Sequence, residues 1–431
     1  MDKNIYLHEN SSIIALDPNE ASFEVVERKF RGHPDSMADM VAQSFTQKYI
    51  KSAWEKIPEL SNIYFPNFSS DKVVLSGAST RCVNGKCEII KPVDALLIGK
   101  ITEKIGNIEI DIDAIFKDSV ETVLSRCLGH NDFKPYVNRK TYSISFAGAD
   151  HDKGFYNPSS VADLLKILKN ETHANDTVYV VAYSPLSVSE KLVIYLDNLT
   201  ASKEFKKLFP EIGSDIKAMV RRRSSDFEIT MCLPVFPEKI QDNQLYNRII
   251  KEATKYIHKE IILFLEKNTR YFKKPTIKLW TNTKDTKDKK YYAIWGTALS
   301  KGDVGAVGRG NRQQGFISGV RPSTNEAMSG KNPNHFAGIV YQLVAENISK
   351  LIFDELGQKN AIYITANNGD FLEHPNSIDV ILEKNSLYQK EAISKIVKKS
   401  LKLIPEFRMN FINSDPYERF MSSNMLSRKV K

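Results

Sequence analysis

The sequence predicts an α/β (α+β) protein in which three similar units each consist of a sheet with helices on one face. A chain of 431 residues is long enough for two or three domains with a large core. Stretches with strand-like alternation are followed by stretches with helical periodicity in three successive rounds. The content of 42% hydrophobic and 26% charged residues is ordinary for a globular protein. The units are expected at 1–135, 136–285 and 286–431, with approximate boundaries.

Apolar periodicity and cap residues place the individual elements. The first unit is expected to contain a strand at 22–29, a helix at 34–54, a strand at 72–79, one or two strands within 87–101 and a helix at 111–127. The second should contain strands at 141–146 and 178–183, a helix at 187–198, a strand at 225–233 and a helix at 243–267. The third should contain a strand at 291–295, a glycine-rich loop, a helix at 334–355, strands at 361–366 and 378–382 and a helix at 388–403. Ser187 and Glu190 have the spacing of a capping box.

The remaining segments are predicted to be irregular. Residues 1–20 are polar and read as a loose arm, and the basic residues 419–431 read as a frayed tail. Linkers are expected at 131–139, 268–274 and 281–290. The run of three arginines at 221–223 is interpreted as a solvated turn.

Charge and hydropathy exclude some classes of protein. No stretch approaches about 18 uninterrupted apolar residues, so no transmembrane helix and no membrane partner are expected. The N-terminus lacks the apolar core of a signal peptide, which favours a cytoplasmic protein. The net charge of +9 suits polyanionic ligands, but the sequence has no recognisable nucleic-acid module, and no nucleic-acid partner is expected.

Four cysteines are too few for a disulfide scaffold of this size. Cys82 and Cys87 flank Asn84-Gly85, a dipeptide typical of hairpin turns, so the two cysteines are expected to face each other across a hairpin. A zinc site would need two further ligands that the sequence does not offer. The prediction is therefore reduced thiols.

The strongest chemical signal lies between residues 302 and 333. Four glycines fall within residues 302–310, where they allow the backbone to bend and to present N–H groups to an anion. Arg309, Arg312, Arg321 and Lys331 add cations, and arginine forks match phosphate oxygens. The loop is not a Walker A loop, because no Gly-Lys-Ser/Thr follows at the required spacing. A mobile surface loop is the alternative for this stretch alone.

A second polar cluster occupies residues 27–36. Pro34 suits the first turn of a helix, which places Gly32, His33 and Asp35 at a helix N-terminus. Free N–H groups and the helix dipole favour anions there, and Asp35 could add a magnesium ligand. An ordinary helix start with a surface histidine is the alternative.

Together the two clusters resemble a known family. The sequence Gly-His-Pro-Asp at 32–35, Gly-Asp-x-Gly-x-x-Gly-Arg-Gly-Asn-Arg at 302–312 and Ser-Gly-Lys-Asn-Pro at 329–333 is similar to the archaeal-type S-adenosylmethionine synthetases, also called methionine adenosyltransferases. Residues 174–177 and 183–187 resemble the central motif of that family, and Asp215-Ile216-Lys217 resembles another. The resemblance covers about 27 to 341, which is most of the chain.

The resemblance implies three α/β domains around a pseudo-threefold axis, interleaved in sequence, in a homodimer or dimer of dimers with interfacial active sites. It implies that the sulfur of L-methionine attacks C5′ of ATP and that the released tripolyphosphate is cleaved to phosphate and diphosphate. It also implies Mg²⁺, with two ions per site, and K⁺.

By match to the family, His33 stabilises the leaving group and Asp35 binds magnesium. The residues implied as phosphate clamps are Lys217, Arg309 and Lys331. The implied substrate contacts are Asp215 at the ribose, Asp176 at the methionine sulfur and Asp303 at the methionine amine. Glu27, Gly305, Gly308, Gly310, Asn311 and Arg312 are carried over as further substrate-binding residues.

Three positions depart from the family pattern, mostly at the amino-acid end of the implied site. Ala78 stands where a Glu or Gln is usual, Val304 replaces an Asp, and His335 appears displaced by one position. No second metal-binding Asp is identified. Two alternatives therefore stay open: an ATP-dependent adenosyltransferase with a different amino-acid substrate, and a non-enzymatic basic protein that binds nucleic acid.

Overall fold

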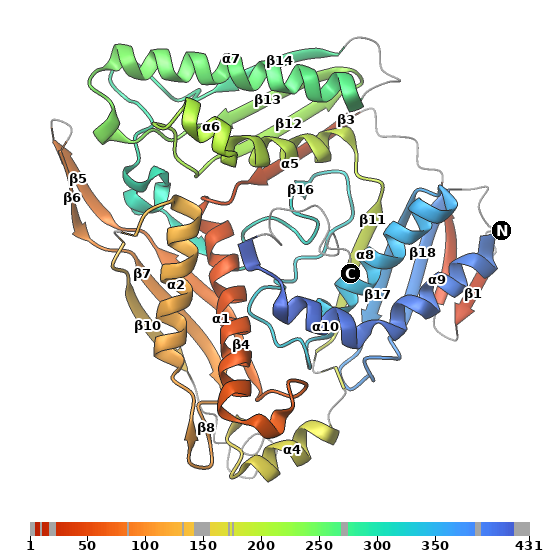
Figure 1. The fold of residues 1–431 in the computed structure, drawn as a ribbon. Helices are drawn as coiled ribbons and strands as arrows, with labels where there is room; N and C mark the ends of the chain where they lie inside the picture. The colour runs from red at the N-terminus through yellow and green to blue at the C-terminus, as the bar shows by residue number, and fades with distance from the viewer. Residues whose placement is uncertain are drawn as a thin grey trace.

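The computed structural model describes residues 5–8, 11–16, 23–83, 86–131, 133–141, 156–170, 173–174, 176–268, 275–383 and 389–417. In this part of the chain, three large sheets form three lobes around a common centre (Figure 1). The predicted α/β class with helices on one face of each sheet is confirmed. Two short hairpins and a few single-turn helices complete the described structure.

The first lobe contains the strand order β14-β13-β12-β3-β16. Its strands are β3 (Phe23–Lys29), β12 (Lys217–Arg223), β13 (Asp226–Cys232), β14 (Thr276–Thr281) and β16 (Ile317–Ser318). Helices α5 (Val188–Ala201), α6 (Lys203–Leu208) and α7 (Asn243–Asn268) cover one face and close a core of their own. The predicted capping box is confirmed, because Ser187 accepts from the Glu190 N–H while Glu190 accepts from the Ser187 N–H.

The second lobe has the strand order β10-β7-β4-β15. Its strands are β4 (Phe68–Ser76), β7 (Asp94–Ile101), β10 (Tyr136–Thr141) and β15 (Val304–Ala306). Helices α1 (Pro34–Lys56) and α2 (Ile112–Leu128) pack on one face. Helix α1 is buried along most of its length, so it carries the core of this lobe. A hairpin of β5 (Ser79–Val83) and β6 (Lys86–Lys91) extends from the lobe, and β8 (Lys104–Ile105) pairs with β9 (Ile108–Glu109).

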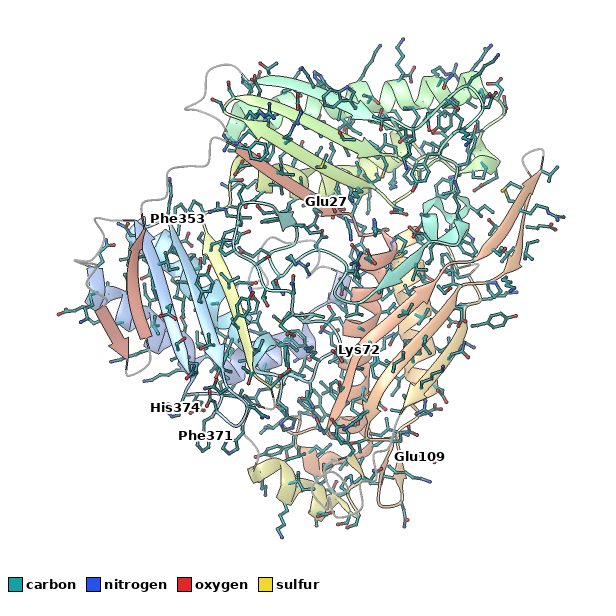
Figure 2. All side chains as sticks on the ribbon, turned by 180° about the vertical axis from the view of Figure 1, so that it is seen from behind. Glu27, Lys72, Glu109, Phe353, Phe371 and His374 are labelled. Carbon is teal, nitrogen blue, oxygen red and sulfur yellow. A yellow bond between two sulfur atoms is a disulfide. The ribbon has the colours of Figure 1, made fainter. Side chains whose placement is uncertain are left out.

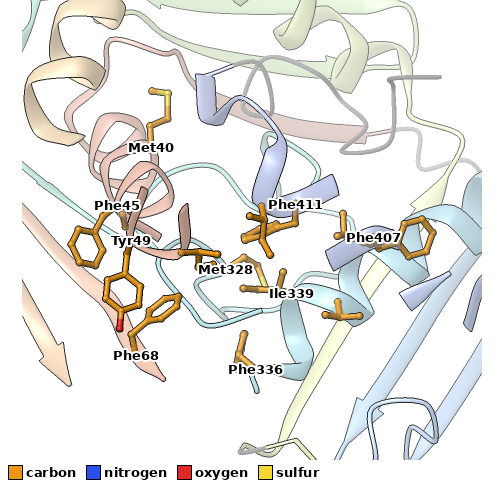
Figure 3. Packing of buried hydrophobic residues seen from close by; sticks show 14 of the residues in the cluster. Met40, Phe45, Tyr49, Phe68, Met328, Phe336, Ile339, Phe407 and Phe411 are labelled. Atoms are coloured by element: carbon orange, nitrogen blue, oxygen red, sulfur yellow. The ribbon is translucent and has the colours of Figure 1, made fainter. Parts of the chain in front are cut away.

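The third lobe has the strand order β1-β2-β18-β17-β11. Its strands are β1 (Ile5–His8), β2 (Ser11–Leu16), β11 (Val178–Ser184), β17 (Asn360–Ala366) and β18 (Ser377–Glu383). Helices α8 (Ala337–Leu356), α9 (Lys390–Lys402) and α10 (Ile404–Asn413) lie on one side, and α4 (Val161–Asn170) lies apart from them (Figure 1). The segment 328–336 joins the second and third lobes, because Met328 and Phe336 belong to one buried cluster with residues of α1 and α10, and Phe336 lies at the start of α8 (Figure 3).

Each sheet is assembled from distant parts of the chain. Strand β3 pairs with β12 and β16, which follow it by about two hundred and three hundred residues. Strand β2 lies beside β18, and β15 lies beside β4. The consecutive spans 1–135, 136–285 and 286–431 therefore do not each coincide with one sheet. Each large sheet also contains pairs of strands that are close in sequence, such as β12 with β13 and β17 with β18.

Several local predictions were wrong. Residues 5–8 and 11–16 form β1 and β2 instead of a loose arm. The linker predicted at 131–139 contains most of β10, which pairs in parallel with β7. Of the strand predicted at 141–146, only Thr141 is among the described residues. The strand predicted at 291–295 is replaced by a single helical turn, Ile294–Gly296, in which Trp295 has φ 61°. For β1, β2 and β10, pairing across the sheet outweighed the local pattern.

The arginine run and the cysteines also differ from expectation. The run at 221–223 lies in β12, and the buried Arg222 donates to Glu24 at 2.7 Å instead of standing in a solvated turn. Cys82 and Cys87 occupy directly opposed positions of the β5–β6 hairpin and are joined by a disulfide, so the prediction of reduced thiols was wrong for this pair. Cys127 and Cys232 are free thiols.

Other predictions match closely. Helix α7 extends only one residue beyond its predicted end, and α1 two. Helix α8 begins at Ala337 instead of 334, because the Asn332 carbonyl accepts from His335 and Phe336 in a turn. The linker 268–274 and the tail 419–431 lie outside the described residues, apart from Asn268, which ends α7. In the part of the chain that is described, no helix has the length and apolarity to cross a membrane.

Candidate functional site

The junction of β3 and α1 forms the base of the candidate site. His33 caps α1, and its Nδ1 accepts the Asp35 N–H at 3.2 Å. Pro34 fills the first helical position, as the sequence predicts. Gly32 is required for space, because a Cβ there would lie 2.4 Å from the Ser214 backbone carbon. The sequence thus places an imidazole and a carboxylate at a helix N-terminus, where backbone N–H groups face outward.

The glycine-rich loop lies directly on this helix start. The Ala306 N–H donates to Asp35 Oδ1 at 3.0 Å, and the Gly308 N–H donates to Asp39 Oδ1 at 2.9 Å. A Cβ at Gly305 would lie 2.1 Å from the Pro34 carbonyl oxygen. The loop is therefore docked on α1 by two carboxylates one helical turn apart, and it is not a mobile surface loop detached from the body.

Lys29 links β3 to α1 and to the glycine-rich loop. Its Nζ lies 2.9 Å from Asp35 Oδ2 and also donates to the Arg309 carbonyl. Asn311 forms two hydrogen bonds with the Lys29 backbone, at 2.7 and 3.0 Å. Sequence reasoning assigned no role to Lys29 or Asp39. The spacing of Asp35 and Asp39 on one helix face was the signal that could have identified Asp39.

Burial shifts the protonation equilibria of this cluster. Desolvation lowers the pKa of His33 to about 4, although the negative charges of Asp35 and Asp303 oppose the shift. The imidazole is therefore neutral near pH 7. Desolvation raises the pKa of Asp39 to about 7, against the hydrogen bond from Gly308, and the nearby charge of Asp35 adds to the rise. A neutral histidine beside a carboxylate and a cation is suited to contacting an anion without repelling a metal ion.

A second group of residues adjoins the first at the start of β12. Asp215 is buried and accepts the Ala298 N–H at 2.7 Å and the Thr297 hydroxyl at 3.3 Å. Burial raises its pKa to about 7, and Asp303 and Asp35 are among the charges that reinforce the shift. Lys217 Nζ pairs with Glu27 Oε2 at 2.8 Å. Lys217 also influences the His33 titration, so the two groups belong to one electrostatic neighbourhood.

A cavity of about 550 Å³ opens beside Lys217 and Glu27. Figure 2 shows Glu27 at the end of β3 that points toward the centre of the molecule. The segment 282–291 forms much of the cavity wall, with Asn282 and Tyr291 among its lining residues. The sequence analysis treated this segment as a linker only. The length and polarity of this segment did not indicate that it would line a cavity. That role depends on the path of the segment beside β13 in the folded protein.

The two cations proposed as phosphate clamps have different surroundings. Arg309 is exposed, and among the described residues its guanidinium has no hydrogen bond or ion pair. Lys331 instead pairs with Glu326 at 2.9 Å and lies 3.9 Å from Asp71. Its ammonium also sits 3.7 Å from the centroid of the Phe336 ring. Thus only Arg309 presents a free charge next to the docked loop.

The remaining predicted residues occupy different positions. Asp303 is exposed beside β15, and its Oδ1 accepts the Val304 N–H at 2.9 Å. Arg312 donates to the Gly308 carbonyl at 3.2 Å and so braces the loop. Asp176 is exposed just before β11, and no hydrogen bond or ion pair joins it to the glycine-rich loop within the described residues. A single chain therefore brings together most of the predicted site. Lys331 lies at its edge, because its partner Glu326 lines a small pocket together with Asp39 and Gly308.

The positions that depart from the family pattern also have definite surroundings. Ala78 is buried, and its N–H donates to the Leu299 carbonyl at 2.8 Å. Val304 is half exposed, next to Asp303. His335 is buried, and burial lowers the pKa of its imidazole to about 4.

The donor set fits a magnesium ion that arrives with a phosphate ligand. Within the described ranges, no group of three or more His, Cys, Asp or Glu side chains could hold a metal. Asp35 and Asp39 nevertheless offer carboxylate oxygens one helical turn apart at the helix start. Mg²⁺ is commonly held by one or two carboxylates together with substrate phosphates. The arrangement therefore matches a shared site and does not form an all-protein cage.

Comparisons with known proteins show the family to which the chain belongs. The family model for S-adenosylmethionine synthetase (AdoMet synthetase) matches residues 3–415. An S-adenosylmethionine synthase of Hyperthermus butylicus is 32% identical over 361 residues, covering 81% of this chain and 82% of that one. An uncharacterized protein of Streptococcus pyogenes serotype M3 is 28% identical over 390 residues, covering 89% and 91%.

A solved structure of an unusual S-adenosylmethionine synthetase from Campylobacter jejuni has the same fold. The TM-score is 0.55 at 16% sequence identity, and the match covers 94% of this chain and 95% of the other. The family model and the named synthase relatives indicate that the molecule is a transferase enzyme. With a family match across nearly its whole length, the chain belongs to the S-adenosylmethionine synthetase family.

Proposed function

We propose that the protein is a methionine adenosyltransferase that forms S-adenosylmethionine from ATP and L-methionine. The methionine sulfur attacks C5′ of ATP, the C5′–O bond breaks, and tripolyphosphate leaves with the bonding electron pair. Water then cleaves the tripolyphosphate to phosphate and diphosphate. The observation that carries the proposal is the docking of the glycine-rich loop on the His33–Asp35 helix start through Ala306 and Gly308.

The chemistry requires negative charge to be stabilised on the departing oxygen. His33, neutral because of its burial, is in place to contact that oxygen at the helix N-terminus. Arg309 is part of the loop, and its guanidinium has no partner within the described chain, so it supplies a free cation there. Asp35 and Asp39 would hold magnesium, which neutralises phosphate charge when bound. Two Mg²⁺ ions per site and a K⁺ ion remain part of the proposal.

The adenosine portion fits the cavity beside Lys217. Its lining combines four lysines, two carboxylates and the aromatic Tyr291, which suits a ribose and a flat base close to phosphate groups. Asp215 would accept a ribose hydroxyl, and Lys217 would move from Glu27 toward a phosphate oxygen. Asp176 and Asp303 are proposed at the methionine sulfur and amine. Among the described residues, no hydrogen bond or ion pair joins Asp176 to the loop of its own chain, and the proposal assigns Asp176 to the site of a partner subunit.

A homodimer in which the sheets of two subunits pack face to face would bring the second subunit to the site. Viewed from the side opposite the helices, all three sheets turn their uncovered faces toward the same side of the molecule (Figure 2). Exposed apolar side chains occur on strands of all three lobes, including Met219, Trp280 and Tyr179. Such a broad, partly apolar surface is typical of a subunit interface. A cytoplasmic location completes the proposal.

A second candidate is an adenosyltransferase with a different amino-acid substrate. Ala78 has no polar side chain for a substrate ammonium or carboxylate, and Val304 is half exposed beside Asp303. Neither change affects His33 or the loop residues Ala306 and Gly308 that donate to α1. They therefore alter only the amino-acid end of the proposed site.

The test is a single-turnover reaction of the purified protein with ATP, Mg²⁺ and L-methionine, with products identified by mass. S-adenosylmethionine and inorganic phosphate together are the expected result. Parallel reactions with a methionine homologue that has one more methylene separate the two candidates. Failure to consume ATP with any thioether amino acid would contradict both. Gel filtration with light scattering tests the dimer, and a strict monomer that turns over would contradict the shared site.

A further inference from the structure

A second cavity, of about 620 Å³, is lined in part by Ser214, the residue before Asp215. Its lining comes from the loop after β3, the end of α2, α6, and the turns at Pro237–Lys239 and Ile294–Gly296. The volume is within the range of small-molecule sites, which is roughly 300–1,000 Å³. The proposed adenosyltransferase chemistry uses none of its side chains.

The cavity is rich in positive charge. Its lining cations are Arg31, Arg126, Lys206 and Lys239, and Glu238 is its lining carboxylate. Arg126 is balanced by Asp415 at 2.6 Å. Arg31 pairs with Asp197 at 3.0 Å, and Arg28 contacts the same carboxylate. No carboxylate pairs with Lys206 or Lys239 among the residues that the structure describes. The cavity therefore has an excess of positive charge that a ligand can neutralise.

Lys206 is positioned to donate into the cavity. Its Nζ donates to the Ile212 and Gly213 carbonyls at 3.0 and 2.9 Å. An ammonium has three N–H groups, so one remains for a ligand. Burial lowers the pKa of Lys206 to about 8, and the charges of Arg31 and Lys239 lower it further in the same direction. An anion in the cavity relieves this repulsion.

The segments 214–217 and 291–295 each contribute to the lining of both cavities, and the second segment is strained. Trp295, which lines the second cavity, has φ 61°, a conformation that large residues rarely adopt. The next residue, Gly296, accepts the Ser214 and Asp215 N–H groups at 3.1 and 3.0 Å. Thr297 then contacts Asp215 and the Gly32 carbonyl. A ligand against Trp295 thus contacts the back of the segment that positions Asp215.

We propose that this cavity is a second binding site for a small phosphate-bearing anion. Lys206 and Lys239 contact its phosphate oxygens, Arg31 supplies long-range attraction, and Trp295 packs against the rest of the molecule. The ligand is either an inorganic oligophosphate or an organic phosphate with a flat ring. Both place the same charge against the lysines, and they differ in the contact with Trp295. The inference does not depend on the adenosyltransferase proposal, because it concerns binding and not turnover.

The experiment uses Trp295 as a local reporter. In the Trp54→Phe/Trp280→Phe protein, Trp295 is the remaining tryptophan of the three in the chain. Inorganic pyrophosphate and adenosine monophosphate are titrated separately at one fixed salt concentration, and Trp295 fluorescence is recorded. A saturable change with either probe is expected. Tighter binding of pyrophosphate identifies an inorganic ligand, and tighter binding of adenosine monophosphate identifies an organic phosphate. No change at millimolar concentrations of both probes would overturn the proposal.

Substitutions that remove either a positive or a negative charge from the cavity lining test whether the probes bind in this cavity. Lys239→Gln should weaken binding and Glu238→Gln should strengthen it, each by about two- to fivefold, because both side chains are exposed. Lys206→Gln should weaken it by about tenfold or more, and a thermal melt checks its folding. Lys251→Gln on α7 is the matched control that removes one exposed charge elsewhere. Equal affinities in all four variants would overturn the proposal, as would loss of the signal only in Arg309→Ala.

Discussion

Arg309 and Lys331 were both predicted to bind phosphate through their positive charges, but their surroundings in the structure differ. Arg309 stands exposed on a loop that is held by backbone bonds to Asp35 and Asp39. Lys331 is half-buried and already engaged with Glu326, Asp71 and the Phe336 ring. An anion gains the full attraction of a free cation, but it must compete for a paired one. The local environment of a cation, more than its place in a motif, determines its contribution to binding.

The largest effect is expected at the helix start on which the Arg309 loop rests. His33→Ala should lower the rate of S-adenosylmethionine formation by about 100-fold or more, the scale of losing one preorganised charge stabiliser. The measurement is a single-turnover assay with saturating ATP and methionine.

A second substitution separates catalysis from capping. His33 also caps α1, so alanine will cost some stability. Asparagine is a good N-cap, and His33→Asn should melt closer to the parent while remaining slow. Turnover by His33→Asn at the parent's rate would show that His33 only caps the helix.

Arg309→Ala should give the next largest change. Loss of a charge-assisted contact should weaken tripolyphosphate binding by roughly ten- to a hundredfold, whereas adenosine binding should hardly change. Calorimetric titration at one salt concentration measures both. Lys251→Ala is the control, because Lys251 is an exposed cation on α7. Arg222 is unsuitable as a control, since it is buried against Glu24. Unchanged affinity with intact folding would remove Arg309 from the phosphate site.

Lys331→Ala should have a smaller effect on the same titration, about threefold, because its ion pair with Glu326 must break before it reaches an anion. Glu326→Gln sharpens the comparison by freeing Lys331, and it should strengthen tripolyphosphate binding. If Lys331→Ala weakens binding as much as Arg309→Ala, then the pairing seen in the single chain does not persist in the working enzyme.

The smallest expected effect is on stability. Burial raises the pKa of Asp39 to about 7, so its folded state holds a proton that the unfolded chain has lost above pH 4. The stabilisation is complete below the unfolded pKa and is lost as the pH rises through 7. Asp39→Asn keeps an acceptor for the Gly308 N–H and has no charge to bury. Its melting temperature relative to the parent should therefore be higher at pH 8 than at pH 5. An equal difference at both values would contradict the raised pKa.

Local sequence patterns predicted the elements that depend on neighbours a few residues away. The proline and histidine at the start of α1, the capping box of α5 and the apolar stripe of α7 were all readable, because caps and helical faces repeat every three or four residues. The class of fold followed from the alternation of such elements. The glycine-rich loop and the helix start could also be named as one candidate site, although their contact could not be derived from spacing.

Only the tertiary structure decided the long-range pairings. It placed residues 5–8 and 11–16 in the sheet that contains β18, buried Arg222 against Glu24 and put Lys331 beside Glu326 and Asp71. It also brought the Gly308 N–H to Asp39, and it formed two cavities that share the segments 214–217 and 291–295 in their linings. The physical reason is that hydrogen bonds, charges and burial act over a few ångströms in space. Contacts between residues hundreds of positions apart leave no periodic trace in the chain, so the sequence by itself determined the elements and the tertiary structure determined their partners.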